Sequence, residues 1–278
     1  MAVRYINRNS IQVPQKLATL YANQAEFDNA KQAIANGTDI RKGLYRHDSV
    51  KLALETLYKD VCFLCQKSVK DNYDVEHLLP WSKHFPERAY DWENLHQSCK
   101  ECNQKKKRHT YKELDTTDHN KVIDILLLDP TRAQVDQFIT FDPFTSESVV
   151  TERGNTVLKA QTTTHFLNSS DYVLARKAHW DAIRDIFTSE EWFDAYRKLR
   201  SEYRNHNVIN LNFADELDSK VGSLCYRIAT GFLGLNRPYN MFVARVMNQN
   251  IKVNPYAIKH FAQQHCVNVG SLLPALVV

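Results

Sequence analysis

Apolar residues in the first sixty positions recur at the spacing of amphipathic helices. Pro14 suits a first helical position, and an apolar face follows it until Gly37 ends the pattern. A second helix is expected after Asp48 and Ser49, whose side chains can cap it, and its apolar positions continue toward Val61. Both helices lead into the segment with the most distinctive residues of the chain.

In the middle of the chain, apolar residues recur at shorter spacings than in the helices expected before it. Apolar and polar residues alternate from Tyr73 to Pro80, which predicts a short strand, and residues 92–107 lack glycine and proline, as is typical of a helix. A β-hairpin followed by a helix is the simplest structure that fits this order. The apolar run 122–130 suits a strand or a helix equally. Residues 135–163, rich in Thr, Val and Phe, predict a small antiparallel sheet.

Helical spacing returns after residue 170, where one apolar face includes Val173, Ile183 and Phe187. Further helices are expected at 190–205, 214–233, 238–249 and 255–265. The predicted fold class is α+β and mainly helical. We expect four regions: a helical region 1–57, a compact core 58–112, a mixed β extension 113–170, and a helical region 171–278 that docks a partner.

Composition limits the class of protein. Of 278 residues, 43% are hydrophobic and 11% aromatic, as in folded globules. The formal net charge of +4 permits a nucleic-acid partner without requiring one. No apolar run approaches the roughly 18 residues that span a bilayer, and the N-terminus lacks the pattern of a secretory signal. We expect a soluble, cytoplasmic protein with no membrane partner.

Two Cys-x-x-Cys pairs contain four of the six cysteines: Cys62, Cys65, Cys99 and Cys102. Each such turn presents two sulfurs to one metal, so two turns complete the tetrahedral coordination of Zn²⁺. Because four protein ligands leave no open position, this zinc would be structural. The alternative is a redox pair or ordinary buried thiols, which the presence of two pairs disfavours. Cys225 and Cys266 stand alone in apolar surroundings and suit buried thiols.

Between the two pairs lie residues that suit phosphodiester hydrolysis. This reaction needs a base that activates water and a cation that stabilises charge on the phosphate. The imidazole of His77 suits the base, since its unperturbed pKa is about 6.5. A hard cation such as Mg²⁺ prefers oxygen ligands, which Glu76 and an asparagine carbonyl can provide. In a regular strand Glu76 and His77 would point to opposite faces, so they share one site only if the backbone twists or the substrate lies edge-on.

The segment after the second pair adds another oxygen and several cations. If residues 95–107 are helical, Asn103 and two lysines lie on one face, and the zinc fixes the helix near Asn103. The candidate contacts to a nucleic-acid backbone are Lys105, Lys106, Lys107 and Arg108. A solvated basic face explains this run equally well. Three other histidines suit surface or core positions better than catalysis: His84, His96 and His109.

At these positions the chain resembles the HNH endonucleases, whose ββα-metal core shows C-x-x-C, (D/E)-H-x-x-P, N-L and C-x-x-C-N-x-x-K. The corresponding residues are the two cysteine pairs, Glu76 to Pro80, Asn94-Leu95 and Asn103 to Lys106. The resemblance implies a ββα-metal core stabilised by a structural zinc on the four cysteines. It also implies that His77 is the general base and that Asn94 fixes the loop that holds it. Glu76 and Asn103 would be ligands of a catalytic Mg²⁺ or another divalent cation.

Two positions depart from that pattern. Glu76 stands where many members have Asp, and its extra methylene can alter metal spacing or preference. Asn103 stands in place of the final histidine of the family's name, as in the subgroup with C-N-x-x-K. Neither departure removes the catalytic interpretation.

The flanking segments are similar to the nuclease subunit of Septu-type and retron-associated antiphage systems. The similar pieces are the N-terminal Arg-Tyr-Ile-Asn-Arg, Leu-Leu-Asp-Pro at 127–130, and the threonines at 162–164 before Phe166 and Arg176. This resemblance implies a bacterial defence role beside an ABC/SMC-type ATPase, with a retron reverse transcriptase and its msDNA as further partners.

The resulting hypothesis is a metal-dependent HNH endonuclease that cuts DNA or RNA, tRNA included, within an antiphage complex. The alternative is a zinc-stabilised nucleic-acid-binding module without catalysis. That alternative explains the cysteines and the basic run but leaves Glu76, His77 and Asn94 without a role.

Overall fold

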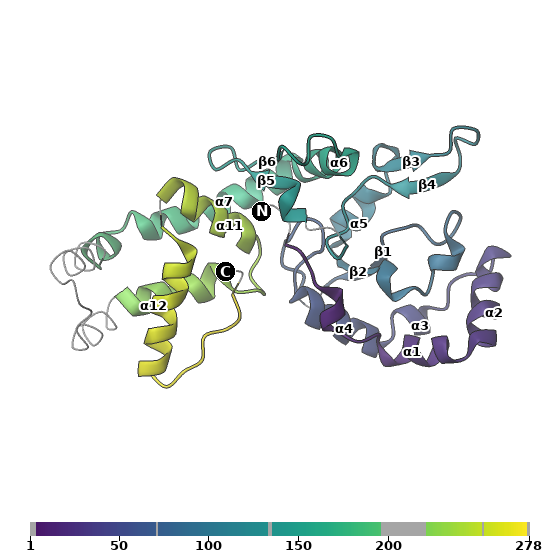
Figure 1. Ribbon diagram of the computed structural model, residues 1–278, viewed down its shortest axis with the longest axis horizontal. Helices are drawn as coiled ribbons and strands as arrows, with labels where there is room; N and C mark the ends of the chain where they lie inside the picture. The colour runs from purple at the N-terminus through teal and green to yellow at the C-terminus, as the bar shows by residue number, and fades with distance from the viewer. Residues whose placement is uncertain (1–3, 71, 133–134, 196–220, 252, 277–278) are drawn as a thin grey trace. The chain divides into compact units, whose positions relative to one another are not determined.

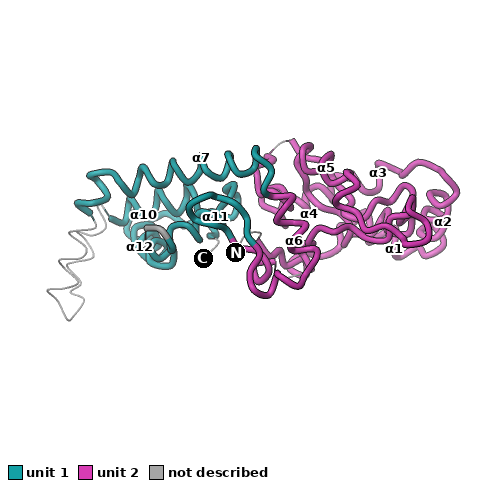
Figure 2. The backbone as a smooth tube through the Cα atoms, turned by 90° about the horizontal axis from the view of Figure 1, so that it is seen from above, with its two compact units in different colours: residues 1–2, 141–149, 168–278 teal, residues 3–140, 150–167 magenta. Residues whose placement is uncertain are grey.

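The computed structural model describes residues 4–70, 72–132, 135–195, 221–251 and 253–276. The chain divides into two compact units (Figure 2). One unit contains residues 3–140 and 150–167, and the other contains residues 141–149 and 168–278. Each unit is described below by itself, and the division into four regions stays a prediction.

Four N-terminal helices begin the first unit (Figure 1). They are α1 (Gln15–Ala22), α2 (Gln24–Ala35), α3 (Lys42–Tyr45) and α4 (Asp48–Tyr58). The predicted continuous helix from Pro14 to Gly37 is wrong, because Asn23 interrupts it and its side chain accepts a hydrogen bond from the Glu26 amide at 3.2 Å. The predicted caps Asp48 and Ser49 lie inside α4, and His47 caps the helix instead, since its side chain accepts from the Ser49 amide.

Strands β1 (Asp74–His77) and β2 (Leu95–Ser98) pair antiparallel, with Glu76 opposite His96 and His77 opposite Leu95. The short helix α5 (Lys100–Lys106) follows β2 directly. The predicted helix over 92–107 is therefore wrong in its first half, where a 3-10 turn, η3 (Trp92–Asn94), precedes β2. All four residues of β2 are buried, so pairing with β1 outweighs local helical preference. The predicted order of hairpin and helix is confirmed.

Two more strand pairs complete the β structure. The apolar run at 122–130 contains strand β4 (Val122–Ile125), which pairs antiparallel with β3 (Lys112–Leu114). Strands β5 (Ile139–Phe141) and β6 (Ser148–Val150) form a two-stranded sheet in the region where a sheet was predicted. The end of that region is instead helix α6 (Leu158–Leu167), which buries Phe166 completely. The chain also has short 3-10 turns at Arg8–Ser10, Pro86–Arg88, His109–Tyr111 and Val135–Gln137.

The second unit is helical. Its main helices are α7 (Ser170–Phe187), α10 (Ser223–Ile228), α11 (Asn240–Val246) and α12 (Pro255–Asn268). Short π-helical segments follow α10 and α11, at Ala229–Leu233 and Met247–Ile251. The predicted Asn254 cap of the last helix is confirmed, since its side chain accepts from the Tyr256 amide at 2.9 Å.

Residues 196–220, which carry much of two predicted helices, lie outside the described residues. The C-terminal region is helical where it is described, as predicted. Within the described ranges, none of the helices combines the length and the apolar character that crossing a bilayer requires.

Candidate active site and cysteine cluster

The four predicted zinc ligands converge in the first unit. Cys62, Cys65, Cys99 and Cys102 are buried, and their sulfur atoms lie within 4.8 Å of one another. A tetrahedral zinc with bonds of about 2.3 Å separates its sulfur ligands by about 3.8 Å. The sulfurs of Cys65 and Cys99 are 3.8 Å apart. The donor set and its spacing therefore fit Zn²⁺.

Backbone hydrogen bonds fix both cysteine turns. The Cys62 amide donates to the Lys67 carbonyl at 2.9 Å, and the Phe63 amide donates to Gln97 of β2 at 2.9 Å. Cys99 is the N-cap of α5, and its sulfur accepts from the Cys102 amide at 3.4 Å. The cluster thus joins the turn at 62–65 to the end of β2 and the start of α5.

Beside the cluster, β1 and α5 present polar groups to each other. Glu76, a predicted metal ligand, forms an ion pair with Lys106, at 2.7 Å between Oε1 and Nζ. Both residues are buried, at 8% and 3% exposure. Burial raises the pKa of the Glu76 carboxyl and lowers the pKa of the Lys106 ammonium, and the ion pair opposes both shifts.

Asn103, the second predicted metal ligand, lies on the same side. Its Nδ2 donates to Oδ2 of Asp74 at 2.8 Å, and its carbonyl Oδ1 is buried with no hydrogen-bond partner among the described residues. Buried carbonyl oxygens are normally satisfied, so this atom indicates room for a donor or a cation. Asp74 was not predicted as a site residue. The signal was its position two residues before Glu76, which places both carboxylates on one face of β1.

Asp74, Glu76 and Asn103 offer the oxygen donors that a hard divalent cation such as Mg²⁺ prefers. The cysteine cluster is the only group of three or more Cys, His, Asp or Glu ligands that converges in the described ranges. A cation bound at these oxygens would therefore depend on Asn103 and on a rearrangement of Glu76, whose oxygen is paired with Lys106.

His77 lies on the opposite face of β1 from Glu76, as strand alternation predicts. Its Nε2 makes a 2.8 Å hydrogen bond with the Ala89 carbonyl, so Nε2 carries the proton and Nδ1 is the basic nitrogen. The Tyr45 ring lies 4.9 Å from the imidazole, centroid to centroid. Burial, with a smaller contribution from the nearby Lys106 and Arg46, lowers the pKa of His77 to about 3. The imidazole is therefore neutral at physiological pH.

Asn94 holds the loop that carries the partner of His77. Its Oδ1 accepts from the Leu79 amide at 2.8 Å, and its Nδ2 donates to the carbonyls of Leu79 and Arg88 at 3.0 and 3.1 Å. Arg88 directly precedes Ala89, whose carbonyl bonds His77. This geometry supports the predicted role of Asn94 in fixing the loop.

The basic run divides between the interior and the surface. Lys106, predicted as a backbone contact, is buried beneath Glu76 and does not face solvent. Lys105 is half-buried and donates to the Phe166 carbonyl. Lys107 and Arg108 are exposed and remain candidates for phosphate contacts.

The other histidines occupy three different environments. His96 is fully buried, and its Nδ1 lies 2.7 Å from the Tyr58 hydroxyl. Half-buried His84 accepts from the Val122 amide at 3.1 Å, whereas His109 is exposed. Each environment suits a core or surface histidine.

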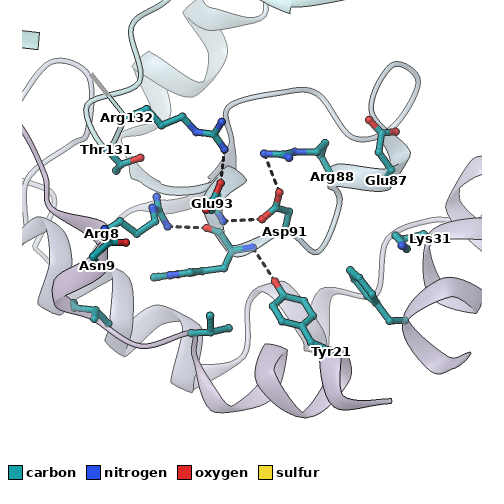
Figure 3. Close-up of a pocket in the computed structure, with 14 residues that line it drawn as sticks. Arg8, Asn9, Tyr21, Lys31, Glu87, Arg88, Asp91, Glu93, Thr131 and Arg132 are labelled. Atoms are coloured by element: carbon teal, nitrogen blue, oxygen red, sulfur yellow. Dashed lines mark hydrogen bonds and ion pairs between the residues drawn. The ribbon is translucent and has the colours of Figure 1, made fainter. Parts of the chain in front are cut away.

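A cavity of about 840 Å³ opens beside residues 87–93, which include Ala89, the hydrogen-bond partner of His77 (Figure 3). Arg8 lines it and donates to the Trp92 carbonyl at 2.7 Å, while the Tyr21 hydroxyl accepts from the Trp92 amide at 2.9 Å. Arg8 also donates to the Leu95 carbonyl at 2.9 Å. These two residues were not predicted to support the site, because their contacts lie about seventy residues or more away in sequence.

The strand pair, the following helix and the cysteine cluster together define a ββα-metal arrangement. Residues 62–109 match the family model described as HNH endonuclease. This match indicates a nuclease domain that acts on nucleic acid, and it spans the cluster and every predicted catalytic residue. Neither the curated proteins nor the solved structures contain a match to the chain.

Replacing Cys65 with serine tests the zinc assignment. We expect wild-type protein to contain about one zinc ion per chain, since four thiolates close one site. Cys65→Ser should lose most of this zinc and lower the midpoint of thermal unfolding of the first unit. Metal analysis and calorimetry measure both effects. Cys225→Ser, at a buried cysteine outside the cluster, should keep its zinc; equal zinc in both variants contradicts the assignment.

Replacing Asn94 with aspartate tests the loop contacts. The carboxylate can still accept from Leu79 but cannot donate to the two carbonyls. We expect the free energy of unfolding to fall by about 1–2 kcal/mol, since two part-buried carbonyls lose their donor. Denaturant titration measures this loss. Asn120→Asp, at an exposed position, is the control, and an equal effect of the two changes would contradict the role of Asn94.

Proposed function

We propose that the chain is a metal-dependent endonuclease that hydrolyses phosphodiester bonds in DNA or RNA. The observation that supports this most directly is the hydrogen bond from His77 Nε2 to the Ala89 carbonyl, within the segment that matches the HNH family model. It fixes the tautomer in which Nδ1 is the nitrogen that accepts a proton.

In this proposal His77 Nδ1 accepts the proton of the attacking water. The water oxygen forms a bond to phosphorus as the bond to the leaving oxygen breaks, and the leaving oxygen is protonated by solvent. The hydrogen bond from Nε2 to the Ala89 carbonyl orients the ring and stabilises the imidazolium that results. Asn94 keeps that carbonyl in place through Arg88 and Leu79.

Glu76 and Asn103, with Asp74 as a further oxygen, would hold the divalent cation. A bound divalent cation supplies charge stabilisation to the phosphate and the leaving oxygen. The unpartnered Oδ1 of Asn103 supports this assignment, because a carbonyl oxygen is a ligand that Mg²⁺ accepts. Lys107 and Arg108 would contact the backbone of the substrate, which carries no sequence information of its own.

The setting of this activity rests on the resemblance of the flanking segments to nucleases of Septu-type and retron-associated antiphage systems. We propose that the chain works in the bacterial cytoplasm beside an ABC/SMC-type ATPase. The helical residues 171–278 would dock that partner. A retron reverse transcriptase with its msDNA is the further partner that this resemblance implies.

Replacing His77 with alanine tests the proposed mechanism. With Mg²⁺ or Mn²⁺, and with the ATPase if it is required, wild-type protein should cut DNA or RNA, and chelation should stop the reaction. His77→Ala should lower the cleavage rate by about a hundredfold or more, because general-base catalysis is lost. Cleavage is measured on labelled substrates, with zinc content and unfolding as checks on the fold.

His109→Ala is the matched control, because His109 is an exposed histidine of the same segment. Full activity of His77→Ala would overturn the mechanism. A wild-type protein that binds nucleic acid but cuts under no partner condition would favour the zinc-stabilised binding module.

A further inference from the structure

The ammonium group of Lys106 occupies a built site for a cation. Its Nζ lies 2.7 Å from Oε1 of Glu76, 2.8 Å from the His77 carbonyl and 3.2 Å from the Leu78 carbonyl. An ammonium has three protons, so these three oxygens satisfy it completely. The side chain is 3% exposed, and the contacts are therefore shielded from water.

The ammonium of Lys106 is paired with the carboxylate of Glu76, on which the proposed metal site depends. Two cations that share one buried carboxylate repel each other strongly, since little water screens them. A divalent ion and Lys106 therefore compete for Glu76. The competition does not extend to Asn103, whose Oδ1 is free of hydrogen-bond partners in the described ranges.

Neither member of the pair can leave without a replacement partner. Removing one ion of a buried pair leaves the other charge uncompensated, which is strongly unfavourable. Glu76 can exchange the ammonium for a metal ion. Lys106, the last residue of α5, needs a new anion, and the phosphate of a bound nucleic acid is the one that the proposed reaction brings.

We propose that Lys106 is a positioning residue that holds the carboxylate of Glu76 closed to metal until substrate phosphate draws the ammonium away. This inference rests on the proposed nuclease function and adds its regulation. Metal and nucleic acid then bind with positive coupling, because each stabilises the arrangement that the other needs. The free protein has low metal affinity at this site, which limits cleavage to the complex with substrate.

Binding of Mn²⁺ to the zinc-loaded full chain tests the proposal without using activity. Free Mn²⁺ is counted by electron paramagnetic resonance, with and without a phosphorothioate oligonucleotide that resists cleavage. We expect the oligonucleotide to tighten Mn²⁺ binding by wild type by about tenfold. Lys106→Met should bind Mn²⁺ about tenfold more tightly than wild type without the oligonucleotide, because the competing charge is gone.

Two variants separate a charge effect from a structural one. Lys106→Arg keeps the cation and should return the Mn²⁺ affinity toward the wild-type value. Lys100→Met removes an exposed cation at the first residue of α5 and should leave the affinity of the free protein unchanged. Unaltered affinity in Lys106→Met, with Glu76→Gln binding more weakly, would overturn the role of Lys106 but leave the proposed metal site intact. Equal binding by Glu76→Gln and wild type would instead overturn that metal site.

Because Lys106→Met leaves a buried carboxylate unpaired, a measurement on wild type complements it. Reductive methylation followed by mass spectrometry reports the reactivity of each lysine. Lys106 should be protected in the free protein and react several-fold faster when Mn²⁺ saturates the site without oligonucleotide, because the displaced ammonium then lacks a phosphate partner. Protection that does not change between the two states contradicts the exchange.

Discussion

Four cysteine sulfurs converge within 4.8 Å and bring together the segments that carry the candidate catalytic residues. They join a turn after α4, the end of β2 and the first turn of α5, three segments too short to bury a core alone. Among the described strands, β1 pairs with β2 alone, and its polar side chains meet α5. The position of every candidate catalytic residue would therefore depend on a metal ion bound by these four sulfurs.

Within this part of the first unit, the alternation of side chains along β1 separates the candidate metal ligands from the candidate base. Asp74 and Glu76 face α5, where oxygen atoms and one ammonium meet. His77 faces the loop at 79–89 and is kept neutral by burial. Lys106 binds the Glu76 carboxylate and, at the strand edge, the backbone carbonyl of His77. Because the oxygen ligands and the base lie on opposite faces of β1, one phosphate reaches both only if it lies against the edge of the strand.

Much of this site could be predicted from the sequence, because the residue types and their spacing carry the signal. The two cysteine pairs indicate a zinc site, and the order Glu-His, Asn, Asn indicates oxygen ligands beside a base. The helix expected over 92–107 was wrong because β2 forms only through pairing with β1, which local propensity does not report. Lys106 looked like a surface cation because its burial depends on Glu76, thirty positions earlier. Arg8 and Tyr21 were missed for the same reason, since they reach the site only through the tertiary fold.

The central claim is that two metal sites of different chemistry lie side by side. One has four cysteine ligands and no free coordination position, and the other has oxygen ligands and leaves positions for water and phosphate. Anomalous diffraction from crystals grown with Mn²⁺ and uncleaved oligonucleotide tests it directly. We predict a zinc peak among Cys62, Cys65, Cys99 and Cys102 and a manganese peak between Glu76 and Asn103. Manganese bound elsewhere in crystals of a cleavage-competent complex, with no peak at Glu76, would contradict the account.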